Sequence, residues 1–277
     1  MHGELPVMHS LSSQCRTHDQ PSSGAARIYG RLAWLDELRC VAIAMMILDH
    51  ALLFFASGEV WAATIRLTLT RCAEPLFLFV FTYLTIYLSR PMRPVRWLQV
   101  ALVSVFTSWV LSRFLGYPVA DILASIAVVA PLLPLLLTIP RGWWVGGLYA
   151  ATALAIFPVG AAGVVFDYSP ALIVYQVLLV RLYCEEGHRG VARHGTLSAS
   201  LLVMATAIFG PLGVTPSPSA FVVLFGHPLA AIAIKVFVNR DAHYSTPLKR
   251  LASKPLTVYA THLLVFAALA ILLDARD

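Results

Sequence analysis

The first apolar segment of the chain carries charged and titratable side chains at positions where a membrane helix is normally apolar. Residues 37–57 are long enough to cross a bilayer, yet they include Arg39, Asp49 and His50. On insertion scales, a charged group at the centre of a membrane helix costs about 2.5–3.5 kcal/mol. We therefore expect these side chains to face the polar interior of a helix bundle and to have a function there.

The spacing of these residues places them on one side of a helix. Arg39 and His50 are eleven positions apart, which corresponds to about three helical turns and roughly 16 Å of rise. Eleven steps of about 100° return almost to the starting angle, so both side chains project from the same face. Asp36 lies one turn before Arg39 and can pair with it. The first span is therefore predicted to form one wall of a polar cavity.

The composition indicates the class of protein. The chain is 59% hydrophobic and only 12% charged, whereas a soluble domain has about 25% charged residues. The net charge of +6 does not indicate nucleic-acid binding, because the basic residues lie in short loops and not on one clustered face. The four cysteines include no CxxC pair, so no metal site is expected. We predict an all-α, polytopic bundle of transmembrane helices.

The apolar segments predict the organisation of this bundle. We count about nine segments near the 20 apolar residues that a bilayer requires. Residues 1–30 are polar and are interpreted as a mobile cytosolic tail, and residues 31–277 as a single transmembrane domain. The predicted spans are 37–57, 73–89, 95–115, 118–139, 143–164, 168–184, 196–214, 219–239 and 256–274.

The basic residues predict the orientation of the chain. Cytoplasmic loops of membrane proteins carry an excess of Lys and Arg. With the N-terminus in the cytosol, all but four of the 20 basic residues fall on the cytosolic side, and the exceptions are Arg66, Arg71, Arg113 and Arg276. Residues 59–71 are too short and too charged to span the bilayer, so we expect an amphipathic segment on the outer surface.

With this orientation, several polar residues from different spans lie at a similar depth in the outer half of the bundle. A bundle could bring them together around His50, and such a cluster suits a general base with an orienting carboxylate. The members of this set are Asp49, His50, Arg71, Glu74, Asp121 and His227.

Each candidate also has a structural interpretation. Asp36 and Arg39 can form an ion pair at the membrane interface, where long charged side chains reach toward water. Asp121 stands at the start of a predicted helix, where a carboxylate interacts favourably with the helix dipole. Glu74 can cap its helix in the same way, although a pair with Arg71 would favour a function.

The histidines need the same comparison. His227 can hydrogen-bond a backbone carbonyl that the following Pro228 leaves free. His262, in the last span, is interpreted as a packing histidine whose ring nitrogens are satisfied by neighbours. For His50, beside Asp49 in a long apolar run, we favour a function.

Two stretches near the start of the chain resemble a known family. The sequence WLDELRCVAIAMMILDH resembles the first span of the membrane acyltransferase-3 superfamily, whose signature is an arginine, ten residues and then a histidine. Arg39 and His50 match that spacing. The Asp49-His50 pair followed by RCAEPLFLFVFTYLTIYL is similar to TraX-type members.

Two weaker similarities lie further along the chain. Asp121 begins a DIL segment similar to that of YeiB-like members, and KPLTVYATHLLVF resembles the LTxYxxH segment of the superfamily. The heparan-glucosaminide acetyltransferase branch shares the same plan.

The resemblance implies an integral membrane acyltransferase of the bacterial cytoplasmic membrane. It implies transfer of an acyl group, usually acetyl, from cytosolic acetyl-CoA to a hydroxyl or amine acceptor such as a cell-surface glycan or a pilin-like protein, with no bound cofactor. His50 would deprotonate the acceptor or carry the acyl group, and Asp49 or Glu74 would orient the imidazole. Arg39 would meet the phosphates of CoA. Asp36, Arg71, Asp121, His227 and the basic residues Arg90, Arg93 and Arg96 would help to bind donor or acceptor.

Two other functions fit the same residues. In a transporter or flippase, Asp49, His50 and Glu74 would form a proton relay. In a noncatalytic membrane scaffold, the polar groups would only specify helix packing.

Overall fold

The structure is a computed structural model in which seven parts of the chain are described. The N-terminal residues 1–30, interpreted above as a tail, and Arg90 lie outside them. The described ranges are 33–87, 92–154, 160–161, 164–166, 170–212, 221–238 and 253–274.

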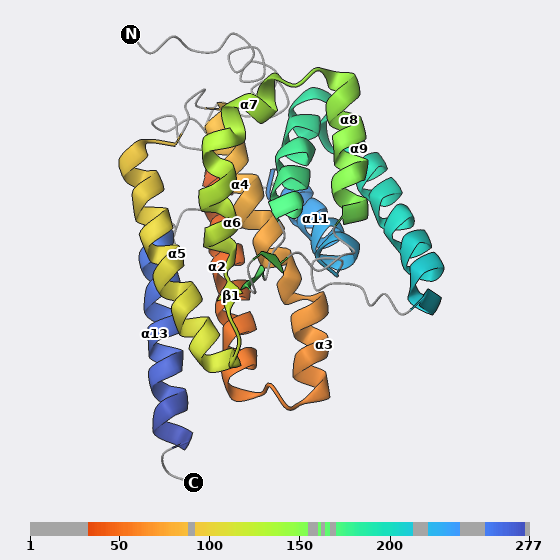
Figure 1. Cartoon of the computed structure of the whole chain (residues 1–277). Coiled ribbons are helices and arrows are strands. Elements are labelled where there is room, and N and C mark those ends of the chain that lie inside the picture. The colour runs from red at the N-terminus through yellow and green to blue at the C-terminus, as the bar shows by residue number, and fades with distance from the viewer. Residues whose placement is uncertain are drawn as a thin grey trace.

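Two helices from the start of the chain pack together inside a helical bundle (Figure 1). These are α2 (Ala33–Phe55) and α4 (Ala73–Tyr87), which are joined by α3 (Val60–Thr68) and the short turn η1 (Thr70–Cys72). Leu35, Leu38, Leu76 and Tyr83 at their contact are almost fully buried. Burial of apolar area of this kind is the main favourable contribution to the folded state.

The neighbours of α2 and α4 form two groups. On one side lie α5 (Pro94–Leu115), α6 (Ile122–Val129) and α13 (Pro255–Asp274), which share a hydrophobic core with α2 and α4. On the other side lie α9 (Pro170–Phe209) and α11 (His227–Val238), which both contact α4 (Figure 1). Helix α2 therefore has a neighbouring helix on each side, α13 on one and α11 on the other.

Among the described residues, five helices are long and apolar enough to cross a membrane. They confirm the predicted all-α class and indicate a membrane protein. Four of them match the predicted first, third, seventh and ninth spans over most of their residues. The fifth is one continuous run that joins α3 to the predicted second span. These helices are Trp34–Phe55, Val60–Ile86, Pro94–Leu115, Arg189–Ile208 and Pro255–Leu273.

The predicted fourth span, 118–139, is not one helix. It is divided into strand β1 (Val119–Ala120), α6, the turn η2 (Ala130–Leu132) and α7 (Leu133–Thr138). Pro131 and Pro134 explain the division, because proline lacks the N–H that an uninterrupted helix needs and clashes with the preceding turn.

The predicted fifth span, 143–164, is also interrupted. Helix α8 (Arg141–Leu154) is followed by strands β2 (Gly160–Ala161) and β3 (Val164–Phe166). β3 pairs in parallel with β1 and antiparallel with β2, and Val165 lies opposite both Val119 and Gly160. The sequence did not predict this three-stranded sheet, because its strands are shorter than any periodicity can indicate.

The predicted sixth and seventh spans belong to α9, which is interrupted at Gly187. This glycine has φ 65° and ψ −156°, a conformation that residues with a Cβ rarely adopt. The predicted eighth span is the shorter apolar run Val222–Phe237, which begins with the π-helical turn η4 (Val222–Gly226). The estimate of about nine full spans is therefore not confirmed.

A left-handed glycine ends α5 and provides a test of this architecture. Gly116 has φ 77° and donates its N–H to the carbonyl of Ser112 at 3.0 Å. We expect Gly116→Ala to lower the free energy of unfolding by about 1–2 kcal/mol, because L-residues are strained in this region. Thermal unfolding in detergent micelles would measure the loss.

Gly146 in α8 is the matched control for this substitution. A Cβ at Gly146 would meet no atom within 4 Å, and the residue lies inside a regular helix. Gly146→Ala should therefore leave stability unchanged or raise it by up to about 1 kcal/mol. Equal losses for the two variants would contradict the assigned end of α5.

Candidate functional site

The polar face of α2 opens into a cavity of about 520 Å³, called here the α2 cavity. Its walls come from α2, η1, α4, α5, α6 and α13. Of the residues predicted as a site, six line it together, namely Arg39, Asp49, His50, Glu74, Arg93 and Arg96. The structure thus places the arginine and the histidine of the first span on one cavity wall, as their spacing predicts.

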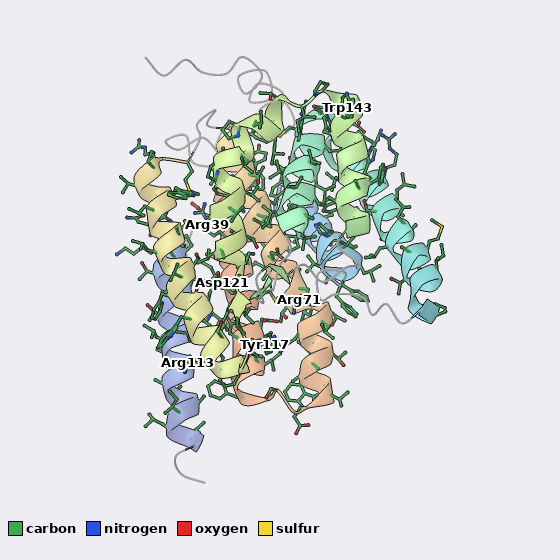
Figure 2. All side chains as sticks on the ribbon, in the orientation of Figure 1. Arg39, Arg71, Arg113, Tyr117, Asp121 and Trp143 are labelled. Carbon is green, nitrogen blue, oxygen red and sulfur yellow. The ribbon has the colours of Figure 1, made fainter. Side chains whose placement is uncertain are left out.

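Three basic residues line the α2 cavity. Arg39 Nη1 forms an ion pair with Asp36 Oδ1 at 2.9 Å, the pair that the sequence predicts. Arg93 and Arg96, beside the first turn of α5, line the same cavity and are exposed. Figure 2 shows Arg39 on the side of the bundle where α5 and α6 lie. This group of three guanidinium groups suits an anionic ligand, and phosphate above all.

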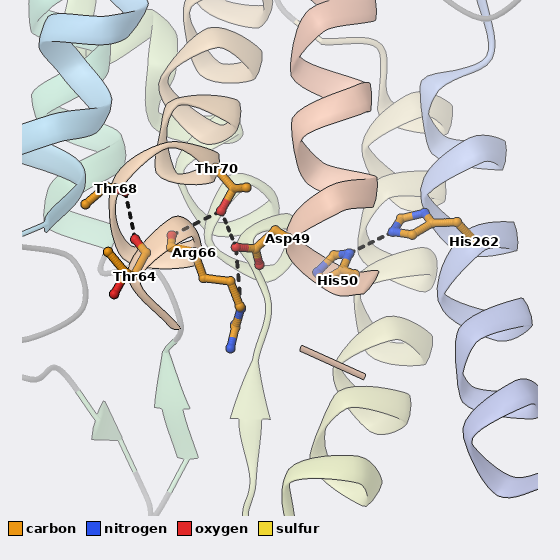
Figure 3. A network of polar contacts seen from close by, with 7 residues as sticks. All are labelled: Asp49, His50, Thr64, Arg66, Thr68, Thr70 and His262. Atoms are coloured by element: carbon orange, nitrogen blue, oxygen red, sulfur yellow. Dashed lines mark hydrogen bonds and ion pairs between the residues drawn. The ribbon is translucent and has the colours of Figure 1, made fainter. Parts of the chain in front are cut away.

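Asp49 is held by residues of η1 and α3. Thr70 Oγ1 donates a hydrogen bond to Asp49 Oδ1 at 2.6 Å, and Arg66 Nε lies 3.6 Å from the same oxygen (Figure 3). Arg66 belongs to α3, which leads through η1 directly into α4. The segment expected on the outer surface therefore supplies a cation beside a membrane carboxylate.

The ring of His50 turns away from Asp49 and meets a second histidine. His50 Nδ1 lies 2.7 Å from His262 Nε2, and each residue is only 8% exposed. Figure 3 shows His50 and Asp49 directed toward different neighbours of α2. Consecutive residues of a helix are about 100° apart, so one of them can reach α13 while the other reaches η1. The hydrogen-bond partner of the imidazole is thus a histidine, whereas the resemblance implies a carboxylate.

Tyr259 completes this end of the cavity. Its ring is edge-on to His50 at a centroid distance of 5.9 Å and edge-on to His262 at 5.7 Å. Tyr259 lines the cavity together with His50, whereas His262 is not among the lining residues. His262 therefore lies behind His50 with respect to the cavity.

The remaining wall of the α2 cavity is apolar. It consists mainly of aliphatic and aromatic side chains from four helices, with few polar groups between its two ends. A cavity with this lining suits an elongated ligand whose polar groups lie at its termini. The apolar lining residues include Phe77, Val80, Phe81, Leu84, Val100, Ile122, Leu123, Ile126 and Leu256.

Asp121 lies outside the cavity and has a structural role. It is 1% exposed, and its Oδ1 accepts the N–H of Ala124 at 3.1 Å, which caps α6. Its Oδ2 is hydrogen-bonded to the hydroxyl of Thr107, and its own N–H donates to Ser108 Oγ at 3.0 Å. Asp121 thus fastens α6 to α5.

His227 and Arg71 also lie away from the cavity lining. His227 Nδ1 is 2.9 Å from the carbonyl oxygen of Val222, and its Nε2 contacts the side-chain amide of Gln176. The ring of His227 thus contacts a backbone carbonyl, but this carbonyl already accepts the backbone N–H of His227 and is not the one that Pro228 leaves free. Arg71 is buried within η1.

The sequence contained signals for the residues that were missed. His262 is a titratable group within an apolar span, which is the same signal that identified His50. Arg66 and Thr70 lie four residues apart on one helical run, so they can reach the same partner. Nothing in the spacing shows that this partner is Asp49, because that contact joins two different helices.

Comparisons with protein families, with curated proteins and with solved structures found no match to this chain.

The contacts of Asp121 predict a stability defect. We expect Asp121→Ala to lower the free energy of unfolding by about 1–3 kcal/mol, because it removes an N-cap and the hydrogen bond from Thr107 that joins α5 to α6. Asp121→Asn keeps the oxygen that caps α6 and should lose less. Unfolding of both variants in detergent would check this, and equal losses would contradict the capping role.

Proposed function

We propose that this protein is an integral membrane acyltransferase that moves an acyl group, such as acetyl, from cytosolic acyl-CoA to a hydroxyl or amine acceptor. The observation that carries the proposal is the single cavity lined by Arg39 at one end and His50 at the other. The resemblance of residues 34–50 to the first span of the acyltransferase-3 superfamily supports it. A cell-surface glycan and a pilin-like protein are the acceptor classes that the resemblance implies.

The basic end of the cavity fits the anionic part of the donor. Arg39, Arg93 and Arg96 can bind phosphate oxygens with charge-assisted hydrogen bonds. The rise from Arg39 to His50 is roughly 16 Å along α2, a length suited to the pantetheine arm of CoA. The thioester would then lie beside His50 while the nucleotide stays at the mouth.

The imidazole of His50 would act on the acceptor at the other end. In this step the acceptor oxygen or nitrogen attacks the thioester carbonyl while its proton moves to the ring of His50. The C–S bond then breaks, and the proton passes from the ring to the departing CoA thiolate. Asp49, balanced by Arg66, and Glu74 would provide the polar environment of the acceptor.

The proposal includes an orientation in the membrane. The N-terminus and the end of the cavity with Arg39, Arg93 and Arg96 would face the cytosol, where acyl-CoA is found, and His50 would lie in the outer half of the bundle. The basic residues of the loops support this orientation. We place the protein in a bacterial cytoplasmic membrane on the strength of the family resemblance.

Consumption of acetyl-CoA by the purified protein tests the reaction. We expect release of free CoA in the presence of water or added acceptors, and a loss of at least about 100-fold in His50→Ala, because general acid–base groups contribute on this scale. His194 is a matched control, since it is similarly buried but lies outside the cavity lining. His194→Ala should keep its turnover. Full activity of His50→Ala would refute the proposed role of the imidazole.

Thermal stabilisation by acetyl-CoA tests the donor site. A ligand at 100 times its Kd stabilises the folded state by about 2.7 kcal/mol. Arg39→Gln should raise the acetyl-CoA concentration needed for the same shift by about tenfold or more, because charge-assisted hydrogen bonds contribute about 1.5–3 kcal/mol.

Arg113→Gln is the control for this measurement. Arg113 lies in the last turn of α5, far along the helix from Arg93 and Arg96, and outside the cavity lining. This variant should respond to acetyl-CoA as the wild type does. A transporter or a scaffold has no donor site, so absence of any stabilisation by acetyl-CoA would favour those functions.

A further inference from the structure

The hydrogen bonds of His262 determine which of its ring nitrogens carries the proton. His262 Nδ1 lies 2.9 Å from the carbonyl oxygen of Val258. A carbonyl oxygen only accepts hydrogen bonds, so Nδ1 of His262 must be the donor. In the neutral ring, Nε2 of His262 is then unprotonated and can only accept.

This assignment determines the proton position on His50 as well. His262 Nε2 is 2.7 Å from His50 Nδ1, and a hydrogen bond at this distance needs one donor and one acceptor. Since His262 Nε2 accepts, His50 Nδ1 must carry the proton. The neutral ring of His50 is therefore left with an unprotonated Nε2. Among the described residues, no side chain or backbone group is recorded as a partner of this nitrogen.

We infer that His262 is a positioning residue that fixes the tautomer of His50, so that Nε2 of His50 is the basic nitrogen presented to the α2 cavity. The role of His50 Nε2 as a base rests on the proposed function, whereas the tautomer follows from the hydrogen bonds alone. Two hydrogen bonds connect the Val258 carbonyl to His262 and His262 to His50. The donor and acceptor of the first hydrogen bond determine the donor and acceptor of the second.

The arrangement gives His262 a defined part in the transfer step. When Nε2 of His50 takes the proton of the acceptor, the ring becomes an imidazolium with N–H groups on both sides. Its Nδ1–H still donates to the lone pair of His262 Nε2, which stabilises the charge. The proton on Nε2 then leaves with the CoA thiolate, and the ring returns to the same tautomer. His262 neither gains nor loses a proton in this sequence.

The surroundings explain why two histidines can replace a histidine and a carboxylate here. Both rings are buried, and Tyr259 packs edge-on against each of them. A buried carboxylate at this position would need its own compensating charge. A neutral imidazole accepts the same hydrogen bond without one.

Chemical modification of His50 tests this inference without acyl-CoA or an acceptor. An unprotonated imidazole nitrogen attacks diethyl pyrocarbonate, so that an ethoxycarbonyl group bonds to nitrogen and monoethyl carbonate leaves. The rate at His50 can be followed by mass spectrometry of its peptide. The rate at His194, outside the cavity, reports whether reagent exposure is equal between samples.

Two variants at position 262 separate a positioning role from a packing role. His262→Phe keeps an aromatic ring but removes the acceptor, so the proton of His50 redistributes between its two ring nitrogens. Because Nε2 is then unprotonated for less of the time, we expect the rate of His50 modification to fall about fivefold. His262→Gln offers a carbonyl oxygen to His50 Nδ1 and should restore most of the rate. His194→Gln should leave the rate at His50 unchanged.

The outcomes are distinct from those of the activity assay. A rate in His262→Phe equal to that of the wild type, or equal losses in the Phe and Gln variants, would overturn the inference even if the protein transfers acyl groups. If His262→Phe does not fold, nitrogen NMR of the ¹⁵N-histidine-labelled wild type, with His50→Gln for assignment, decides the point. A proton on Nδ1 of His50 is expected, and a proton on Nε2 in the neutral ring would overturn the inference.

Discussion

The structure depends on one constraint, which is that Arg39, Asp49 and His50 of α2 need polar partners inside an apolar bundle. Arg39 pairs with Asp36 on its own helix, Asp49 with Thr70 and Arg66, and His50 with His262. An unpaired polar group in such surroundings costs free energy comparable to a lost hydrogen bond or more. These contacts therefore fix how α2 is turned relative to η1 and α13, which apolar packing alone would leave less defined.

The same constraint accounts for the shape of the site. Because the partners of Asp49 and His50 come from different helices, their side chains spread apart and a cavity remains between α4, α5, α6 and α13. The long middle wall is apolar, so polar chemistry is confined to two ends. In the proposed reaction, the charged part of the donor and the reacting carbonyl would be bound by different groups.

Part of this arrangement can be predicted from the sequence. The face shared by Arg39 and His50, the pair between Asp36 and Arg39, and the long apolar helices follow from periodicity and composition. The partner of His50 does not follow, because the contact with His262 joins helices at opposite ends of the chain. The number of full spans is not confirmed, since composition marks 118–139 and 143–164 as apolar but does not show that prolines and a small sheet divide them. Asp121 and His227 show the limit of arguing from depth alone, because residues at one depth can face different neighbours.

The junction between α5 and α6 has a mechanical consequence. Thr107 and Ser108 of α5 are both bonded to Asp121, and Ser112 Oγ accepts the N–H of Val119 at 2.8 Å. These hydrogen bonds join α5 and α6 at the C-terminal half of α5, whereas Arg93 and Arg96 lie at its opposite, exposed end. If α5 tilts when those guanidinium groups bind an anion, it would rotate about this hydrogen-bonded junction. The cavity wall formed by Ile122 and Ile126 would then move with α5, so that the two ends of the α2 cavity change together.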